Sequence, residues 1–333
     1  MRARAAVICL LWMAPLMAAD WNPRLAAQYL DSRQKDWFAW PTANANAKPC
    51  VSCHTGMTYL LARPALRRAL GEKEPTVYET GLLASLRSRV DKREPPAGPG
   101  LGVETVLAAL FLTEPEPFSA LRPALDRMWA LQIKDGEGKG AWNWFSLKLD
   151  PWEMPESRFY GAALAGSAVP EFEKSYFGFQ LLKAYLKNEQ ASQPLHNRLM
   201  FLWAFWRVPD VLDAEVRREI TAKVWQAQQS DGSWTTASMG PFVAQPGAPE
   251  PSGGNAYMTA FTAFVMQQQS PGVRDSRIEK ALNWLRAHQN PVTGRWPAVS
   301  MNKKYPAGSQ ESKFMTDAAT AFAALALLAA DSH

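Results

Sequence analysis

Three turns of similar make-up lie between residue 132 and residue 296 of the chain. Each begins with a glutamine, contains a glycine and closes on a tryptophan, and they cover residues 132–142, 229–234 and 289–296. Glycine supplies positive φ, aspartate can bond nearby amides, and an indole can pack over the turn with its N–H free to donate a hydrogen bond. The last two turns begin 60 residues apart, which predicts an array of helical pairs that bury their apolar faces against neighbouring pairs.

Apolar residues recur every three or four positions around these turns, which is the period of a helix. Pro64 and Pro123 both stand in the word Arg-Pro-Ala-Leu, and because proline suits the first turn of a helix, we expect Pro64 to split or kink its helix. The predicted helices are eleven in number and cover residues 50–70, 76–90, 101–112, 118–131, 157–169, 174–187, 194–206, 213–229, 255–269, 275–289 and 315–330.

The glutamine and tryptophan turns and the paired helices resemble the squalene-hopene cyclase and prenyltransferase repeat superfamily over residues 101–330. The resemblance implies an all-α fold, an α/α toroid of inner and outer helices, in which these turns act as structural staples. The resemblance carries over only this structural role. The matching side chains are Gln132, Trp142, Gln229, Trp234, Gln289 and Trp296.

The first residues have the layout of a secretory signal. Two arginines precede an apolar run from Ala5 to Leu16, and the small residues Ala18 and Ala19 follow. We therefore expect cleavage near Ala19 and a periplasmic or secreted mature protein, with a retained membrane anchor as the alternative. The rest of the chain has no apolar run of the roughly 18 to 20 residues that a spanning helix needs, so no transmembrane segment is expected in the mature protein.

Cys50, Cys53 and His54 form the pentapeptide CVSCH, which is the spacing that attaches haem c. Two thiols separated by two residues match the two vinyl groups of haem, and the adjacent imidazole can serve as the proximal iron ligand. Export permits covalent attachment, and no other cysteine remains once Cys9 leaves with the signal. The alternatives are a disulfide or redox pair beside an idle histidine, and a metal site without haem.

The sixth iron ligand is less clear from the sequence. Met57 would lie on the same side of the iron as His54, which leaves His196, His288, His333 and other methionines, or an open five-coordinate iron. His196 opens an apolar helix and is our candidate distal ligand, although a polar group at a helix start is an ordinary feature. His288 ends a helix, where a cation meets the helix dipole favourably.

The pattern divides the chain into three parts. Residues 1–19 are the signal peptide, residues 20–95 form an N-terminal segment that carries the haem motif and packs on or belongs to the ring, and residues 96–333 form the repeat domain. A linker rich in proline and glycine runs over residues 91–102. A second such stretch, residues 242–254, is long enough for a lid over the ring mouth.

The starts of the expected inner helices carry polar residues, which either cap the helices or form a ligand-binding ring at one mouth of a central cavity. An aromatic set could line the same cavity or belong to the core. The polar set is Glu104, Glu156, His196, Asn197, Asn255 and Asp317, and the aromatic set is Trp203, Phe205, Trp206, Phe261 and Phe264.

The whole chain resembles exported bacterial proteins that join a haem c motif to such repeats, a group with no settled activity. We expect electron transfer or a haem-dependent redox role with an unknown redox partner or an apolar small molecule. One alternative is an isoprenoid-processing lyase or isomerase. The sequence lacks the Asp-X-Asp-Asp motif of terpene cyclases, and its closest pair is Asp210 and Asp213. The candidate acids for such an enzyme are Glu104, Glu156 and Asp317. Another alternative is a non-catalytic binding module, so the sequence leaves open whether the protein is an enzyme.

A net charge of +5 is too small to suggest a nucleic-acid partner.

Overall fold

The chain is helical, as the sequence predicts. The computed structural model describes residues 21–44, 48–90, 100–112, 118–205, 208, 210–250, 252–269, 272 and 274–331. Across these ranges there are thirteen α-helices and no β-strand, with one isolated bridge between Leu149 and Glu153. The expected signal peptide, most of the expected linker, Trp206 and His333 lie outside the described residues.

The helices are short and follow one another closely. Three further 3₁₀ turns lie at Glu171–Glu173, Gln190–Ser192 and Glu311–Lys313. The α-helices are α1 (Pro23–Ala39), α2 (Gly56–Ala69), α3 (Val77–Val90), α4 (Gly100–Phe111), α5 (Phe118–Ala130), α6 (Ser157–Ser167), α7 (Phe177–Glu189), α8 (Leu195–Phe205), α9 (Ala214–Gln226), α10 (Thr236–Met239), α11 (Ala256–Gln267), α12 (Ser276–His288) and α13 (Phe314–Asp331).

All eleven predicted helices are present, with shifts of a few residues at most of their ends. The largest shift is in α2, which begins at Gly56 and leaves the CVSCH motif in the turn before it. Pro64 does not split its helix, because α2 runs through this proline to Ala69, and α5 likewise contains Pro123. Burial of much of α2 outweighs the hydrogen bond that the proline cannot donate.

Helix α1 was missed by the periodicity argument, although its start carries ordinary signals. Pro23 occupies the first turn, and the Asn22 side chain caps the helix by accepting a hydrogen bond from Leu25 N at 3.0 Å. The buried face of α1 includes Arg33 and Gln34 as well as apolar residues. Polar side chains on its inner face therefore hide the apolar stripe on which the sequence argument depends.

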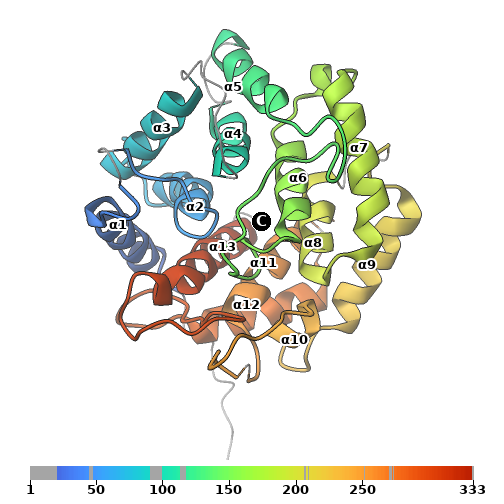
Figure 1. The fold of residues 1–333 in the computed structure, drawn as a ribbon. Helices are drawn as coiled ribbons and strands as arrows, with labels where there is room; N and C mark the ends of the chain where they lie inside the picture. Colours follow the sequence, from blue (N-terminus) through green and yellow to red (C-terminus); the bar gives the residue numbers. More distant parts are fainter. Residues whose placement is uncertain are drawn as a thin grey trace, which may run out of the picture.

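The helices alternate between two positions along the chain (Figure 1). Helices α2, α4, α6, α8, α11 and α13 lie toward the middle of the view, and α1, α3, α5, α7, α9 and α12 lie around them. Helix α13 packs against α11 on one side and against α2 on the other, so the end of the chain contacts its beginning. Residues from both the segment 20–95 and the repeat region thus share one packed core.

The tryptophans of the three repeated turns are buried and hold the turns to the helices before them. In each turn the indole N–H donates to a backbone carbonyl in the preceding outer helix, at 2.7 to 2.8 Å. The three pairs are Trp142 with Met128 of α5, Trp234 with Val224 of α9, and Trp296 with Leu285 of α12.

The glutamines hold each turn to the start of the next outer helix. Gln132 Nε2 donates to the carbonyls of Gly140, in the turn, and Gly178, in α7. In the second turn this role belongs to Gln228, which bonds Gly232 and Arg277, so the prediction of Gln229 as the staple is wrong. Two consecutive glutamines do not reveal in the sequence which side chain turns inward.

Helix α13 is the one helix within the described ranges that is long and apolar enough to cross a membrane by length and composition. The candidate span is Glu311–Asp331, and 72% of its 18-residue apolar window is buried inside the protein. Packing against α11 and α2 accounts for its apolar composition, as expected for a core helix.

Candidate haem site

The CVSCH motif lies in a tightly hydrogen-bonded turn between α1 and α2. Cys50 N donates to Ala43 O at 2.7 Å, and Trp37 Nε1 donates to Cys50 O at 2.8 Å. Ser52 Oγ accepts hydrogen bonds from the backbone N–H groups of Thr55 and Gly56, which orders the start of α2. These hydrogen bonds hold the backbone of the motif between the end of α1 and the start of α2.

Cys50, Cys53 and His54 all line one cavity of about 370 Å³. This volume lies within the range of small-molecule pockets, about 300–1,000 Å³. The wall combines aromatic and aliphatic side chains from four separate segments with a few polar groups. Its other lining residues are Trp37, Trp40, Thr42, Ala43, Ser52, Val103, Phe145, Leu147, Leu149, Glu153, Lys303, Tyr305, Glu311 and Phe314.

The His54 imidazole is held between aromatic rings. Phe314 stacks on it with ring centroids 3.7 Å apart and an interplanar angle of 20°. Trp37 and Trp152 approach it at 5.7 Å with steeper angles. Burial, together with the nearby charge of Arg33, lowers the pKa of His54 to about 3, so the ring is neutral at pH 7 and keeps a lone pair for a metal ion.

The two ring nitrogens of His54 have different surroundings. Nδ1 lies 2.9 Å from Thr55 Oγ1, whereas Nε2 lies 3.8 Å from Glu153 Oε1, beyond hydrogen-bond distance. Glu153 itself lines the cavity. Nε2 thus lies on the side of the ring that is toward Glu153, and it has no hydrogen bond to the residues that the structure describes.

Both thiols are free of disulfide bonds. Burial raises the pKa of the Cys50 thiol to about 12, and burial also raises the pKa of the Cys53 thiol well above its usual value. A thiol attacks a disulfide as its thiolate, so these pKa values make a poor redox dithiol. Two neutral thiols beside an apolar wall can instead add to the vinyl groups of a haem.

Glu153 is the site residue that sequence reasoning missed. Burial raises its pKa to about 7, against the opposing charge of Lys303, so it is near half-ionised at neutral pH. It follows the buried Trp152 in the segment that leads from the Trp142 turn to α6, where no periodic pattern is present. Proximity to His54 depends entirely on the packing of α6 and this segment against the N-terminal turn, so no local signal could have identified it.

His196, the sequence candidate for a distal ligand, lies elsewhere. It is fully buried in α8, and its two ring nitrogens are near Asn197 Oδ1 at 3.1 Å and Tyr257 Oη at 2.9 Å. It does not line the cavity that contains His54. Both nitrogens lie within hydrogen-bond distance of partners inside the core, so His196 fits the alternative interpretation of a polar group at a helix start. We do not propose it as a ligand.

His288 and Met57 also lie away from this cavity. His288 ends α12, where Nδ1 lies 2.7 Å from Trp284 O and the ring stacks on Trp284. Met57 is fully buried, with Sδ 4.0 Å from Tyr160 Oη, and does not line the cavity.

The polar residues at the inner helix starts do not line this cavity either. Glu104 pairs with Arg89 at 3.5 Å, and Asn255 caps α11 by accepting from Met258 N. Asp317 is buried and bonded to Arg33 of α1 at 2.8 Å. The aromatic residues that are described in this set pack in the core, with Phe261 and Phe264 both contacting Phe322.

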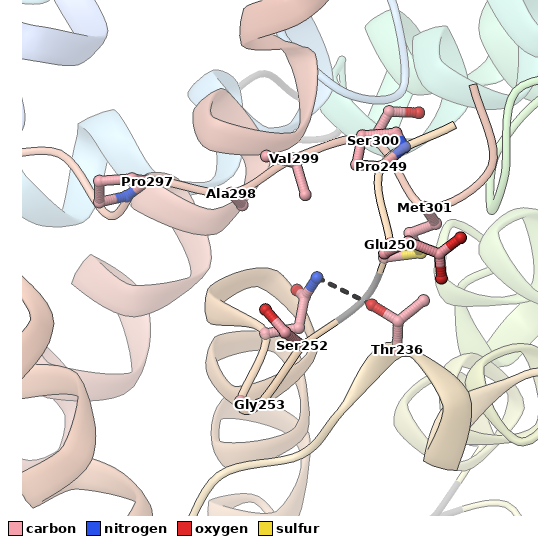
Figure 2. Close-up of a pocket in the computed structure, with 12 residues that line it drawn as sticks. Thr236, Pro249, Glu250, Ser252, Gly253, Pro297, Ala298, Val299, Ser300 and Met301 are labelled. Carbon is pink, nitrogen blue, oxygen red and sulfur yellow. Dashed lines mark hydrogen bonds between the residues drawn. The ribbon is translucent and has the colours of Figure 1, made fainter. Parts of the chain in front are cut away.

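The expected lid segment lines a separate, smaller pocket of about 210 Å³ (Figure 2). Its residues 249–250 and 252–255 face residues 297–301 across that pocket, with Thr236 below. Gln245 N donates to Asn302 O at 2.8 Å, and Gln245 Nε2 donates to Lys148 O at 2.6 Å. The segment is therefore fastened to its neighbours and does not line the cavity at His54.

Among the described residues, no group of three or more His, Cys, Asp or Glu side chains could hold a metal ion by itself. No protein-family model matches the chain, and a search of curated proteins finds no match.

Proposed function

We propose that this protein is an exported c-type haem protein that transfers single electrons or carries out a redox reaction at the haem. Cys50 and Cys53 would be the covalent anchors, and His54 Nε2 would be the proximal iron ligand. The observation that carries the proposal is the cavity of about 370 Å³ that Cys50, Cys53 and His54 all line. A motif match alone would not require that both thiols and the imidazole share one apolar cavity.

The donor set fits this cofactor. Both thiols are unpaired. His54 Nε2 has no hydrogen bond to the described residues, whereas Nδ1 is bonded to Thr55. In a metal-bound histidine one ring nitrogen usually binds the metal and the other is hydrogen-bonded. When bound, the haem would supply reversible one-electron chemistry at iron. The protein's own residues would then set the potential through burial and through the polarity around the site.

The cavity residues have distinct roles in this proposal. Trp37, Trp40 and Phe145 exclude water from one wall, and Phe314 fixes the plane of the imidazole. Glu153 and Lys303 place a carboxyl group and an ammonium group on the polar part of the lining. Leu147 is 57% exposed and marks where the cavity opens to solvent and where a partner or small molecule would approach.

We further propose that the helices close into an α/α toroid. Three contacts support closure between the two ends of the chain. Helix α13 packs on α2, Trp21 Nε1 donates to Asp331 Oδ2 at 2.9 Å, and Gln289 of the third turn bonds the backbone of Asn22. The third turn thus uses α1 as its next outer helix, in the same way that the first turn uses α7.

The isoprenoid-processing alternative receives less support. Protonation of an alkene needs a strong acid in a cavity, whereas Glu104 and Asp317 are paired with Arg89 and Arg33. Glu156, the third candidate acid, lies at the start of α6 and does not line the cavity.

The test uses protein exported by a host that matures c-type cytochromes. The proposal predicts a haem that stays with the polypeptide on a denaturing gel, together with oxidised and reduced visible spectra typical of a thioether-linked haem. The double variant Cys50→Ser, Cys53→Ser should lose the bound haem, whereas Ser88→Ala, at a half-buried serine outside the cavity, should retain it. A colourless wild-type protein with a disulfide between Cys50 and Cys53 would contradict the proposal.

A further inference from the structure

A single hydroxyl links the His54 imidazole to a buried carboxylate on the last helix. Thr55 Oγ1 lies 2.9 Å from His54 Nδ1 and donates to Asp317 Oδ2 at 2.9 Å. All three side chains are buried, and Asp317 is only 1% exposed. The CVSCH turn is therefore connected to α13 through hydrogen bonds that no water is needed to complete.

The donors around Asp317 fix the direction of this chain of hydrogen bonds. Tyr29 Oη donates to Asp317 Oδ1 at 2.8 Å, and Arg33 donates from Nε and Nη2 at 2.8 and 3.0 Å. A carboxylate paired with a guanidinium accepts hydrogen bonds and does not donate them. The Thr55 hydroxyl must therefore donate its only hydrogen to Asp317. The Thr55 oxygen can then only accept from His54, which places the imidazole proton on Nδ1.

Ser52 does not offer an equivalent partner. Its Oγ lies 3.4 Å from His54 Nδ1, and it already accepts from the backbone N–H groups of Thr55 and Gly56 at 3.1 and 3.3 Å. A serine oxygen has two lone pairs, so it cannot accept a third hydrogen bond of full strength. Donation from the Ser52 hydroxyl would have to cross 3.4 Å to an unprotonated Nδ1, which would then face the Thr55 oxygen lone pair at only 2.9 Å. Thr55, the closer partner, therefore decides which tautomer His54 adopts.

Building on the proposed haem function, we propose that Thr55 and Asp317 are positioning residues that set His54 with its Nε2 lone pair toward the cavity and strengthen it as an iron ligand. A hydrogen bond from the remote N–H of a ligating histidine to an oxygen fixes the tautomer and raises ligand basicity. Because Arg33 lies in α1 and Asp317 in α13, the strength of the ligand depends on contact between the first and last helices.

The tautomer can be measured without a cofactor. In the haem-free mature chain with ¹⁵N-labelled histidine, the nitrogen chemical shifts and couplings of His54 should show a protonated Nδ1 and an unprotonated Nε2. The Thr55→Ser variant should keep this pattern, and Thr55→Val should lose it or show exchange between tautomers. A wild-type His54 with its proton on Nε2 would overturn the proposal, whatever the fate of the haem.

The reduction potential of the haem-loaded protein gives an independent readout. Thr55→Val should shift the potential to more positive values, because a less basic imidazole stabilises ferric iron less, and Thr55→Ser should restore the wild-type value. Thr58→Val is the matched control. Its hydroxyl donates to His54 O at 2.7 Å and is equally buried, but it does not touch the ring, so its potential should equal that of the wild type.

The outcomes separate the two proposals. If Thr55→Val binds haem with an unchanged potential and Thr58→Val does the same, the positioning role is wrong and the haem assignment stands. If wild-type protein never acquires haem, the proposed function fails, and the tautomer measurement still decides the role of Thr55.

Discussion

Gln289 forms two hydrogen bonds to the backbone of Asn22, one through each polar atom of its side-chain amide. Its Oε1 accepts from Asn22 N at 2.6 Å, and its Nε2 donates to Asn22 O at 3.0 Å. The same Nε2 also bonds Gly294 O in its own turn at 2.9 Å. A side chain in the last repeated turn therefore holds the residue that caps the first helix. The equivalent glutamines donate to carbonyls in the first turns of α7 and α12, at Gly178 and Arg277.

Replacing the stapling glutamine of the second turn should destabilise the protein, whereas replacing its neighbour should not. Gln228→Ala leaves the carbonyls of Gly232 and Arg277 without their side-chain donor, which should lower the free energy of unfolding by about 1–2 kcal/mol. Gln229→Ala, at an exposed side chain, should change it by less than about 0.5 kcal/mol. Urea unfolding of both variants measures the difference, and equal effects would contradict the assignment of Gln228.

A methyl group at Gly294 should loosen the contact between the third turn and α1. Gly294 has φ +71°, and an added Cβ would lie 2.3 Å from Leu25 C, so both strain and overlap arise. We expect Gly294→Ala to cost about 2–4 kcal/mol. Gly308→Ala is the control, since Gly308 has φ +77° with nothing near its Cβ position and should cost only about 1 kcal/mol. Thermal unfolding that ranks the two variants equally would contradict this contact.

The turn motif in the sequence was the best guide to the fold. Trp142, Trp234 and Trp296 were correctly expected to anchor turns, because each needs an N–H acceptor that a helix end supplies. Helix α1 was missed because Arg33 and Gln34 lie on its buried face and break the apolar stripe. The pairing of Arg33 with Asp317, 284 residues away, explains that burial and leaves no trace in the local sequence.

In the candidate site, too, some residues could be predicted from the sequence and others could not. Cys50, Cys53 and His54 could be read from the sequence because the chemistry requires them within five residues. Glu153 and Phe314 could not, because they come from distant segments that meet the motif only in the folded chain. His196 illustrates the opposite error, since a histidine in an apolar helix suggests a ligand, yet its two nitrogens lie within hydrogen-bond distance of Asn197 and Tyr257.

Loss of the ring that stacks on His54 should weaken both the fold and the site. Phe314→Ala removes a side chain that is 7% exposed, and we expect a loss of about 3–5 kcal/mol in the free energy of unfolding. The visible spectrum of haem-loaded protein should also change, because the imidazole plane is no longer fixed. Phe177→Ala, at a side chain that is 67% exposed, should change the free energy of unfolding by less than about 0.5 kcal/mol and leave the spectrum unchanged. A Phe314→Ala spectrum identical to that of the wild type would show that this ring does not orient His54.

His196 should make stability fall in mild acid. Burial lowers its pKa to about 4, whereas an unfolded histidine titrates near 6.5. Between these values His196 binds more protons in the unfolded chain than in the folded chain, so its contribution to the free energy of unfolding rises with pH across that window and is lost as the pH falls through it. The full contribution is about 3 kcal/mol. His196→Gln, which can still accept from Tyr257, should flatten the dependence between pH 4 and 6.5 relative to the wild type; parallel curves for the two proteins would contradict this.

Intact-mass spectrometry of the exported protein tests the central claim most directly. The account predicts a polypeptide that begins near Asp20 and carries one covalently bound haem, and peptide mapping should place both attachment points at Cys50 and Cys53. A natively exported chain with the mass of the bare polypeptide, or of that polypeptide with a single disulfide, would contradict it.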